Sequence, residues 1–313
     1  MKNIINYYYD VSADNIIYVN DNKYFFEYKN EYFILEEIKD MNVEEIYRKN
    51  VTLMNFGIKC NTIVLTKFFN PYISYESKNY ILYKTYKNYN DIITIKNIID
   101  FNKQIRINNK EISNYNNLLA ISHSWKKIWE NKIDYYENDL TDIILKFPKY
   151  FEIIDYFIGM AENSIQIIGD LQVANYYAQH YRLNKNSTFY DLYDSKNIVF
   201  DSIVRDVSEY IKSYFDSSNF NEIKTTFNEF TKYVSFNNEE SIYLISRILF
   251  PTYFFDKLDE ITMNSENDID KGKNAIFFDN IYHIENNLKL FVELLQKKGI
   301  ITNFIPNWLN KTT

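Results

Sequence analysis

The stretch Val199-Phe-Asp-Ser-Ile-Val-Arg-Asp-Val-Ser-Glu-Tyr-Ile211 joins a short apolar run to an amphipathic pattern. It predicts a strand at 198–200 that leads into a helix at 204–215. Most of the surrounding chain is helical in pattern, and a second short strand is predicted around Phe189–Leu192. The other predicted helices cover 95–105, 112–136, 150–177, 222–233, 242–250, 254–261 and 281–298.

The first 87 residues have a different pattern. Tyr- and Ile-rich runs are separated by polar two-residue turns, which is typical of an antiparallel meander. These runs lie at 16–19, 24–28, 32–38, 62–65 and 80–86. Residues 42–56 are helical in spacing and end at Gly57, a residue suited to a helix C-terminus. The expected fold is α+β and two-lobed, with a small β-sheet lobe carrying one helix at 1–87 and a large helical lobe at 88–313.

Composition excludes several classes of function. The chain has 313 residues, a net charge of −7 and only 5 Gly. The acidic balance opposes nucleic-acid binding, and no 18-residue stretch is free of charge, so neither nucleic acid nor membrane insertion is expected. Loops that cradle phosphate need several glycines close together, and this chain has no such cluster.

The thiol and imidazole content excludes a Cys/His metal site. Cys60 is the single cysteine, and the histidines are His123, His180 and His283. These positions provide neither zinc-ligand spacing nor a disulfide framework, so no metal is expected and a reducing, cytosol-like compartment is predicted. Cys60 is interpreted as a small buried hydrophobic residue.

Several stretches resemble one family in its order along the chain. They are His123–Asp134, Gly159–Gln166, Val199–Ile211, Ser246–Phe255 and Ile305–Leu309. Together they are similar to the CotS-type spore-coat-associated kinase-like proteins, relatives of the aminoglycoside and choline phosphotransferases. The resemblance implies a protein-kinase-like fold of the aminoglycoside phosphotransferase type.

The resemblance also assigns the parts of a phosphate site, and the first of these are changed here. Active members carry a strand Lys that binds the phosphates. In the strand 32–38 the corresponding position is Glu36, whose carboxylate would repel a triphosphate. The segment 16–28, which should cover the phosphates, contains no glycine.

The catalytic loop of the family corresponds to residues 180–187. Its pattern His-x-Asp-x-x-x-x-Asn becomes His180, Arg182 and Ser187 in this chain. An Arg is protonated at any working pH and cannot accept a proton from a substrate hydroxyl. Asp194 falls at the position of the metal-binding Asp, although its flanking residues differ from the usual form.

Arg205 and Asp206 match the family pattern, in which they are structural residues. The resemblance implies that Asp206 caps a helix and anchors the catalytic loop. Trp125 and Trp129, four residues apart on a predicted helix, are interpreted as core anchors. Glu44 and Glu45 are interpreted as a solvated helix N-terminus.

One alternative arrangement keeps phosphotransferase spacing. Gly169-Asp170 and Asn175 have the Gly-Asp-x-x-x-x-Asn pattern, with Ile168 where the His would be. In this alternative Asp170 is the base, Asn175 is a metal ligand and Asp191 or Asp194 is the second ligand, with ATP and Mg²⁺ as cofactors.

The expected function is therefore that of a pseudokinase without catalytic residues or cofactors. It would act through protein partners, and the resemblance implies spore-coat components, in the mother-cell cytoplasm or the spore coat. The alternatives are an active small-molecule kinase that uses Asp170 and Asn175, and a binding module that retains the cleft between the lobes. Nothing in the sequence predicts the oligomeric state.

Overall fold

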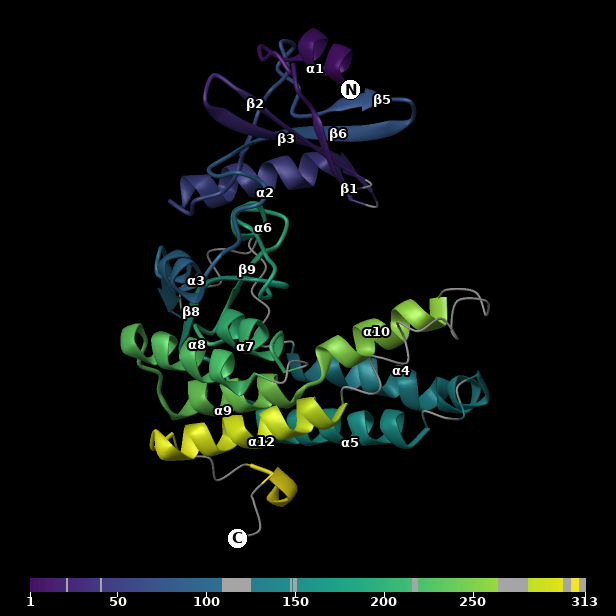
Figure 1. The fold of residues 1–313 in the computed structure, drawn as a ribbon, viewed down its shortest axis with the longest axis vertical. Helices are drawn as coiled ribbons and strands as arrows, with labels where there is room; N and C mark the ends of the chain where they lie inside the picture. Colours follow the sequence, from purple (N-terminus) through teal and green to yellow (C-terminus); the bar gives the residue numbers. More distant parts are fainter. Residues whose placement is uncertain are drawn as a thin grey trace. The chain divides into compact units, whose positions relative to one another are not determined.

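The computed structural model describes residues 1–20, 22–39, 41–108, 125–146, 148, 151–215, 219–263, 281–300 and 305–309. Their contacts divide the chain into two compact units, drawn with their elements in Figure 1. The first unit comprises Met1–Leu119 and Tyr177–Phe200, and the second comprises Ala120–Tyr176 and Asp201–Thr313. The lobe boundary predicted between residues 87 and 88 stays a prediction.

The first unit contains an antiparallel sheet with the order β1-β2-β3-β6-β4, and β5 also pairs with β6. The strands are β1 (Ile17–Asn20), β2 (Lys23–Tyr28), β3 (Glu31–Ile38), β4 (Thr62–Ile63), β5 (Ile73–Tyr75) and β6 (Lys78–Thr85). Lys29 and Asn30 both have positive φ, as do Glu76 and Ser77. Such residue pairs form the two-residue turns that match the twist of a hairpin. The predicted meander is confirmed, and β5 is a strand that the pattern did not predict.

Alternating side chains place the two faces of this sheet in different cores. Phe25, Ile34 and Ile81 pack with residues of α2 (Val43–Asn55). Phe26 and Leu35, one position along the same strands, pack with α1 (Lys2–Tyr8) on the other face. The predicted helix at 42–56 is confirmed as α2, and its N-cap Asn42 accepts a hydrogen bond from the Glu44 amide at 3.0 Å. The sequence predicted one helix in this region and missed α1.

A second, three-stranded sheet has the order β7-β8-β9. Its strands are β7 (Arg106–Asn108), β8 (Asn175–His180) and β9 (Ile198–Asp201), and α3 (Ile95–Asn102) precedes β7. The strand predicted at 198–200 is confirmed as β9. The strand predicted near Phe189–Leu192 is wrong, because these residues form the helical turn α6. The side chains of Thr188 and Asp191 form a capping box that favours this turn.

The described helices of the second unit follow the predicted pattern closely. They are α4 (Trp125–Lys146), α5 (Phe151–Ile168), α7 (Arg205–Lys212), α8 (Phe220–Tyr233), α9 (Asn238–Leu249), α10 (Thr252–Met263), α12 (Ile281–Lys297) and the short η5 (Asn307–Leu309). Residues 112–124 of one predicted helix lie outside the described residues. The helix predicted at 150–177 ends at Ile168, where Gly169 adopts a φ of 48°.

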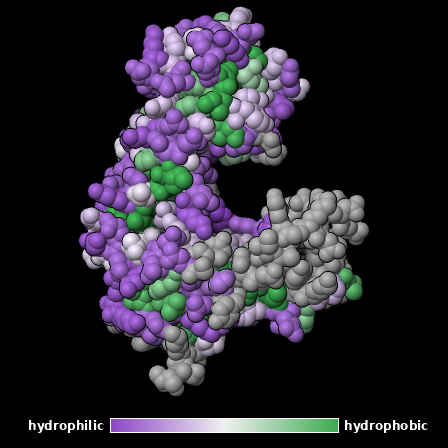
Figure 2. Space-filling view, in the orientation of Figure 1, coloured by the Kyte–Doolittle hydropathy of each residue, from purple (hydrophilic) through white to green (hydrophobic). Residues whose placement is uncertain are grey.

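Trp125 and Trp129 are buried, which confirms them as core anchors. The Trp129 ring stacks on Phe250 with centroids 4.4 Å apart. Helix α7 is the most enclosed part of this core, since every one of its residues is buried. Over the coloured part of Figure 2, hydrophilic side chains dominate the visible face and hydrophobic ones form separate small areas. Within the described ranges, no helix is long and apolar enough to cross a membrane.

Candidate functional site

Glu36 occupies the middle of β3, and its side chain is buried. It points to the same face as Ile34, since successive side chains of a strand alternate. Lys23 is the cross-strand neighbour of Glu36 on β2, and its Nζ lies 3.7 Å from Glu36 Oε1. Two further groups donate to Glu36 Oε2, namely the Tyr190 hydroxyl at 2.8 Å and the Lys196 ammonium. The carboxylate is therefore compensated although it is out of contact with bulk water.

The Lys196 ammonium also binds a second carboxylate. Its Nζ lies 3.4 Å from Asp194 Oδ2, and its backbone amide donates to Asp194 Oδ1 at 3.0 Å. Lys196 thus connects two positions that the sequence assigned to a phosphate site. Glu36 lies where the phosphate-binding Lys was expected, and Asp194 lies where the metal-binding Asp was expected. We call Glu36, Lys196, Asp194, Lys23 and Tyr190 the Glu36 cluster.

Helix α2 holds the Asp194–Lys196 segment in place. Lys49 Nζ donates to the Lys196 carbonyl at 3.0 Å. The amide of Asn50, one residue further on, donates to Ser195 Oγ at 3.0 Å. Both donors lie on the helix face that packs on the sheet, so the helix fixes the segment that carries the ammonium. Glu44 of this helix is exposed and pairs with Arg48 at 3.3 Å, as a solvated helix N-terminus does.

Burial and charge move the pKa values of the cluster in different directions. Burial opposes ionisation of Glu36, but the Lys196 and Lys23 ammonium groups outweigh it and lower the pKa of Glu36. Burial dominates at Asp194 and raises its pKa. The two carboxyls differ because Lys196 is closer to Glu36 than to Asp194. Burial also opposes ionisation of Lys196, but its two carboxylate partners raise its pKa above the ordinary value.

Two further titratable groups lie beside the cluster. Burial lowers the pKa of Lys49 to about 8, although the Asp194 carboxylate acts in the opposite sense. Burial raises the pKa of the Cys60 thiol to about 12, and Asp194 adds to the effect. A buried thiol that stays protonated is a poor nucleophile, which agrees with the interpretation of Cys60 as a core residue.

The predicted catalytic loop has structural contacts in this structure. The His180 ring is buried, packs near Phe101 with centroids 4.6 Å apart, and its Nε2 lies 2.8 Å from the Leu192 carbonyl oxygen. Arg182 is exposed. Ser187 Oγ accepts a hydrogen bond from the Asn184 amide at 3.0 Å and so closes a turn of the chain.

The alternative pair Asp170 and Asn175 lies at a helix end and a strand start. Gly169 and Asp170 follow the last residue of α5, while Asn175 is the first residue of β8. The Asp170 side chain is 97% exposed and pairs with Lys126 at 3.1 Å.

Arg205 and Asp206 lie in the first turn of α7, and both are buried. Val204 is the N-cap residue of this helix, so Asp206 does not occupy the capping position that the resemblance implied. Arg205 Nη1 binds Asp201 Oδ2 at 2.9 Å. The same oxygen accepts a hydrogen bond from the Trp125 indole at 2.7 Å.

A second ion pair extends this buried network. Arg247 Nη2 binds Glu209 Oε1 at 2.6 Å, and the guanidinium groups of Arg205 and Arg247 lie 4.3 and 4.6 Å from the Trp125 ring. Tyr243 donates to Asp201 Oδ1 at 2.8 Å. We call these residues, with Asp201 and Trp125, the Asp201 cluster. It supports the structural role predicted for Arg205.

Sequence reasoning missed Lys196, Lys23 and Tyr190, the partners of Glu36. The available signal was the unusual Asp194-Ser-Lys-Asn order, in which a Lys stands two residues after the expected metal-binding Asp. Lys23 was also recognisable, because a two-residue turn at Lys29 and Asn30 fixes the register that places it opposite Glu36.

Comparison with solved structures defines the class of this fold. An aminoglycoside phosphotransferase from Alicyclobacillus acidocaldarius aligns with a TM-score of 0.61 at 10% identity, over 95% of this chain and 96% of that one. The AMP-bound spectinomycin phosphotransferase aligns with a TM-score of 0.54 at 12% identity, over 88% and 96%. The fold is therefore that of the aminoglycoside phosphotransferase-like kinases, as the sequence predicted.

The family is given by sequence. The model described as "Spore coat putative kinase YutH" matches residues 2–293, and the chain belongs to this family. The predicted resemblance to spore-coat kinase-like proteins is thereby confirmed. Comparison with curated protein sequences gives no match.

Proposed function

We propose that this chain is a pseudokinase of the spore coat, which has the kinase-like fold but transfers no phosphoryl group and acts through protein contacts. The observation that carries the proposal is the binding of the Lys196 ammonium to both Glu36 and Asp194. An active site of this fold class needs free positive charge for phosphates and a free carboxylate for Mg²⁺. Here the Lys196 ammonium is paired with carboxylates, and the Asp194 carboxylate is paired with that ammonium, so neither charge is free.

The charges around Glu36 do not suit a triphosphate. Glu36 is an ionised carboxylate, because its pKa is lowered. A phosphate group brought to its position on β3 would meet like charge in a poorly solvated place, where repulsion is strong. Lys196 cannot offset this, since its charge is already shared between Glu36 and Asp194.

Mg²⁺ does not fit the cluster either. It takes oxygen ligands from one or two carboxylates, phosphates and water. Asp194 already accepts hydrogen bonds from the backbone and ammonium of Lys196. Within the described part of the chain, no group of three or more His, Cys, Asp or Glu side chains could hold a metal ion. We therefore expect no cofactor.

The experiment is nucleotide titration of the intact protein. Isothermal titration calorimetry with ATP and Mg²⁺ is expected to give no binding tighter than about 1 mM. The melting temperature should stay constant when ATP and Mg²⁺ are added, because a ligand that does not bind the folded state cannot stabilise it. Phosphoryl transfer to amino-alcohols that is lost in Asp194→Asn would overturn the proposal.

A genetic experiment tests the non-catalytic role. Asp194→Asn preserves side-chain shape but removes any metal-binding carboxylate, and Phe157→Asp places a charge in the core beside Phe254. Spores that carry Asp194→Asn should assemble the coat like wild type, whereas Phe157→Asp should give the phenotype of a deletion. A deletion-like coat in Asp194→Asn spores with normal amounts of folded protein would contradict a purely structural role.

A further inference from the structure

The loop between β4 and β5 presents two phenylalanines to solvent. Phe69 is 83% exposed and Phe68 is 60% exposed. The backbone of Phe69 has a φ of 62°, a left-handed conformation that a bulky side chain rarely adopts. Residues held in such strained conformations cluster at binding and functional sites.

Hydrogen bonds fix this conformation. The Thr66 amide donates to the Asn70 carbonyl at 2.9 Å, and the Phe69 amide donates to the Thr66 carbonyl at 2.9 Å. Thr66 Oγ1 accepts from the amides of Phe68 at 3.2 Å and Asn70 at 3.0 Å. The Lys67 amide ties the loop to the end of α1 through the Tyr8 carbonyl at 2.8 Å. The loop backbone is therefore fixed before any partner binds; the Phe68 ring packs edge-on against Tyr8 with centroids 6.4 Å apart, and the Phe69 ring is the more exposed of the two.

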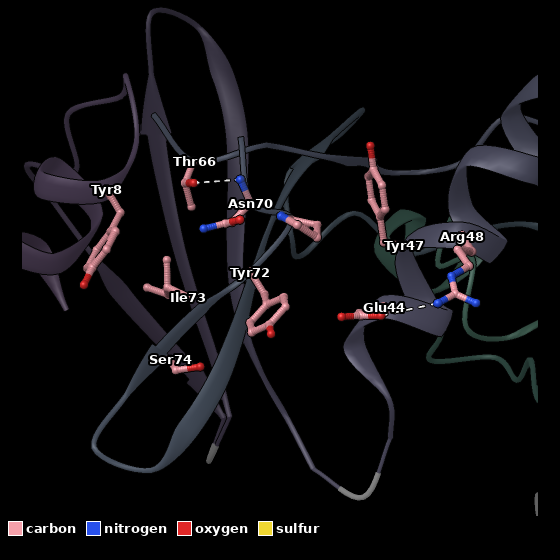
Figure 3. Close-up of a pocket in the computed structure, with 10 residues that line it drawn as sticks. Tyr8, Glu44, Tyr47, Arg48, Thr66, Asn70, Tyr72, Ile73 and Ser74 are labelled. Carbon is pink, nitrogen blue, oxygen red and sulfur yellow. Dashed lines mark hydrogen bonds and ion pairs between the residues drawn. The ribbon is translucent and has the colours of Figure 1, made fainter. Parts of the chain in front are cut away.

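A cavity of about 590 Å³ lies at the base of the same loop. Figure 3 shows Tyr8 and Tyr72 around it, with Tyr47 on α2 at its far side and Ser74 at its lower edge. Thr66 and Asn70, which flank the two phenylalanines, also line the cavity. The volume lies within the range of about 300–1,000 Å³ that holds drug-sized ligands, so it has room for two phenyl rings.

We propose that this face of the first unit binds a second copy of the chain, with Phe69 of each copy inserted into the tyrosine-walled cavity of the other. Phe69 and the cavity belong to the same loop, since Thr66 and Asn70 line the cavity on either side of Phe69 in the sequence. A surface that carries both complementary features can pair with itself about a two-fold axis, each contact being repeated. The three tyrosines suit an aromatic knob, since offset and edge-to-face ring contacts are favourable. The Glu44 and Arg48 side chains, which also line the cavity, pair with each other at 3.3 Å.

The area involved sets the expected strength. Each aromatic ring buries roughly 150 Å² or more. The rings of Phe68 and Phe69 from both copies, together with the surfaces they cover, would bury roughly 1,200 Å² in all. This area is at the lower limit of specific interfaces. The pair is thus a weak, concentration-dependent dimer, whose partners a dense protein layer would bring together by mass action.

Sedimentation velocity over about 1 µM to 1 mM tests the proposal. Wild type should pass from monomer to dimer within this range. Phe69→Asn keeps a residue that tolerates the left-handed conformation but removes the ring, and it should weaken dimerisation at least about tenfold. Leu145→Asn, a matched control at a side chain that is 75% exposed in the second unit, should dimerise like wild type. A wild type that stays monomeric, or a Phe69→Asn protein that dimerises normally, would overturn the proposal.

A complementation experiment tests the geometry. Ser74→Trp fills the cavity, so this variant alone should also fail to dimerise. A mixture of Phe69→Asn and Ser74→Trp proteins can form one intact knob-and-cavity contact per pair. The mixture should therefore dimerise more strongly than either variant alone, though less than wild type. If both variants are folded monomers and their mixture also stays monomeric, Phe69 does not insert next to Ser74 and the arrangement is wrong.

Discussion

The Glu36 cluster and the Asp201 cluster are both buried groups of charges. Two guanidinium groups belong to the Asp201 cluster, beside the Lys212 ammonium that also pairs with Glu209 at 2.9 Å, whereas the cations of the Glu36 cluster are ammonium groups. In the Asp201 cluster, guanidinium groups pair with carboxylates and stack on Trp125, and Arg205 is only 1% exposed. In the Glu36 cluster the cations are ammonium groups, and Lys23 is 20% exposed. A guanidinium is planar and permanently charged, whereas an ammonium is a point charge whose pKa follows its surroundings.

The two clusters also lie in different parts of the chain and support different elements. Arg205 belongs to the stretch that matches the family, and its contacts with Asp201 and Trp125 hold a fully enclosed helix in the core. In the Glu36 cluster, a Lys from another segment of the chain compensates the buried carboxylate on β3. The guanidinium groups thus hold helix α7 in the core, whereas the ammonium groups compensate two buried carboxylates in the first unit.

The largest effect is expected from breaking the Asp201 cluster. Asp201→Ala leaves Arg205 as a buried charge without its carboxylate and removes the acceptor of the Trp125 and Tyr243 hydrogen bonds. The free energy of unfolding should fall by about 3–5 kcal/mol, measured by urea denaturation followed by circular dichroism. Asp170→Ala, at the exposed carboxylate, should change it by less than about 0.5 kcal/mol. If Asp201→Ala also lowers the free energy of unfolding by less than about 0.5 kcal/mol, the cluster contributes no stability.

Breaking the Glu36 cluster should have a smaller effect, which depends on pH. Lys196→Met leaves two buried carboxylates together and should destabilise the fold at pH 7 by about 2–4 kcal/mol. In this variant the pKa values of both carboxyls rise, so the folded state takes up protons before the unfolded chain does. Its deficit against wild type should therefore shrink as the pH falls from 7 to 5, as thermal melts at several pH values would show. A deficit that is independent of pH would contradict the ion-pair account.

Exchanging the charges of Glu36 and Lys196 tests whether the two side chains are energetically coupled. Glu36→Lys and Lys196→Glu each place like charges together, whereas the double variant restores opposite charges at the contact. A double-mutant cycle should show that the double variant recovers about 1–2 kcal/mol relative to the sum of the single changes. Additive effects would mean that Glu36 and Lys196 are not coupled.

The smallest effect, taken over the single unit from about pH 8 to about pH 9, concerns Lys49. Its pKa is lowered to about 8 in the folded state, so between this value and its ordinary 10.5 the unfolded chain binds more protons. Lys49 should then contribute a rise of stability with pH above 8 of at most about 1.4 kcal/mol per pH unit, while the raised pKa of the Cys60 thiol acts in the opposite sense. Lys49→Met should lack this rise. An identical pH dependence of unfolding in the two proteins would show that Lys49 titrates normally.

The sequence predicted those parts of the structure that depend on local patterns. The hairpin at Lys29 and Asn30 follows from turn chemistry, and the long helices follow from apolar periodicity. The short apolar run at Phe189–Leu192 was misassigned, because four residues fit strand and helix alike and the capping side chains decide. The Glu36 cluster was predictable only in part. The resemblance implied a Lys at the position of Glu36, but the contact of Glu36 with Lys196 joins residues 160 positions apart, which no local pattern shows.

The placement of Trp125 has a spectroscopic consequence. The chain has 3 tryptophans, and Trp125, Trp129 and Trp308 all belong to the second unit. Indole fluorescence therefore reports on that unit alone, and Trp125, which has two guanidinium groups within 4.6 Å of its ring, should change its emission when the cluster opens. Far-UV circular dichroism instead sums the contributions of the helices and sheets of both units. If the two signals change at different denaturant concentrations, the units unfold separately, and this comparison needs only one unlabelled sample.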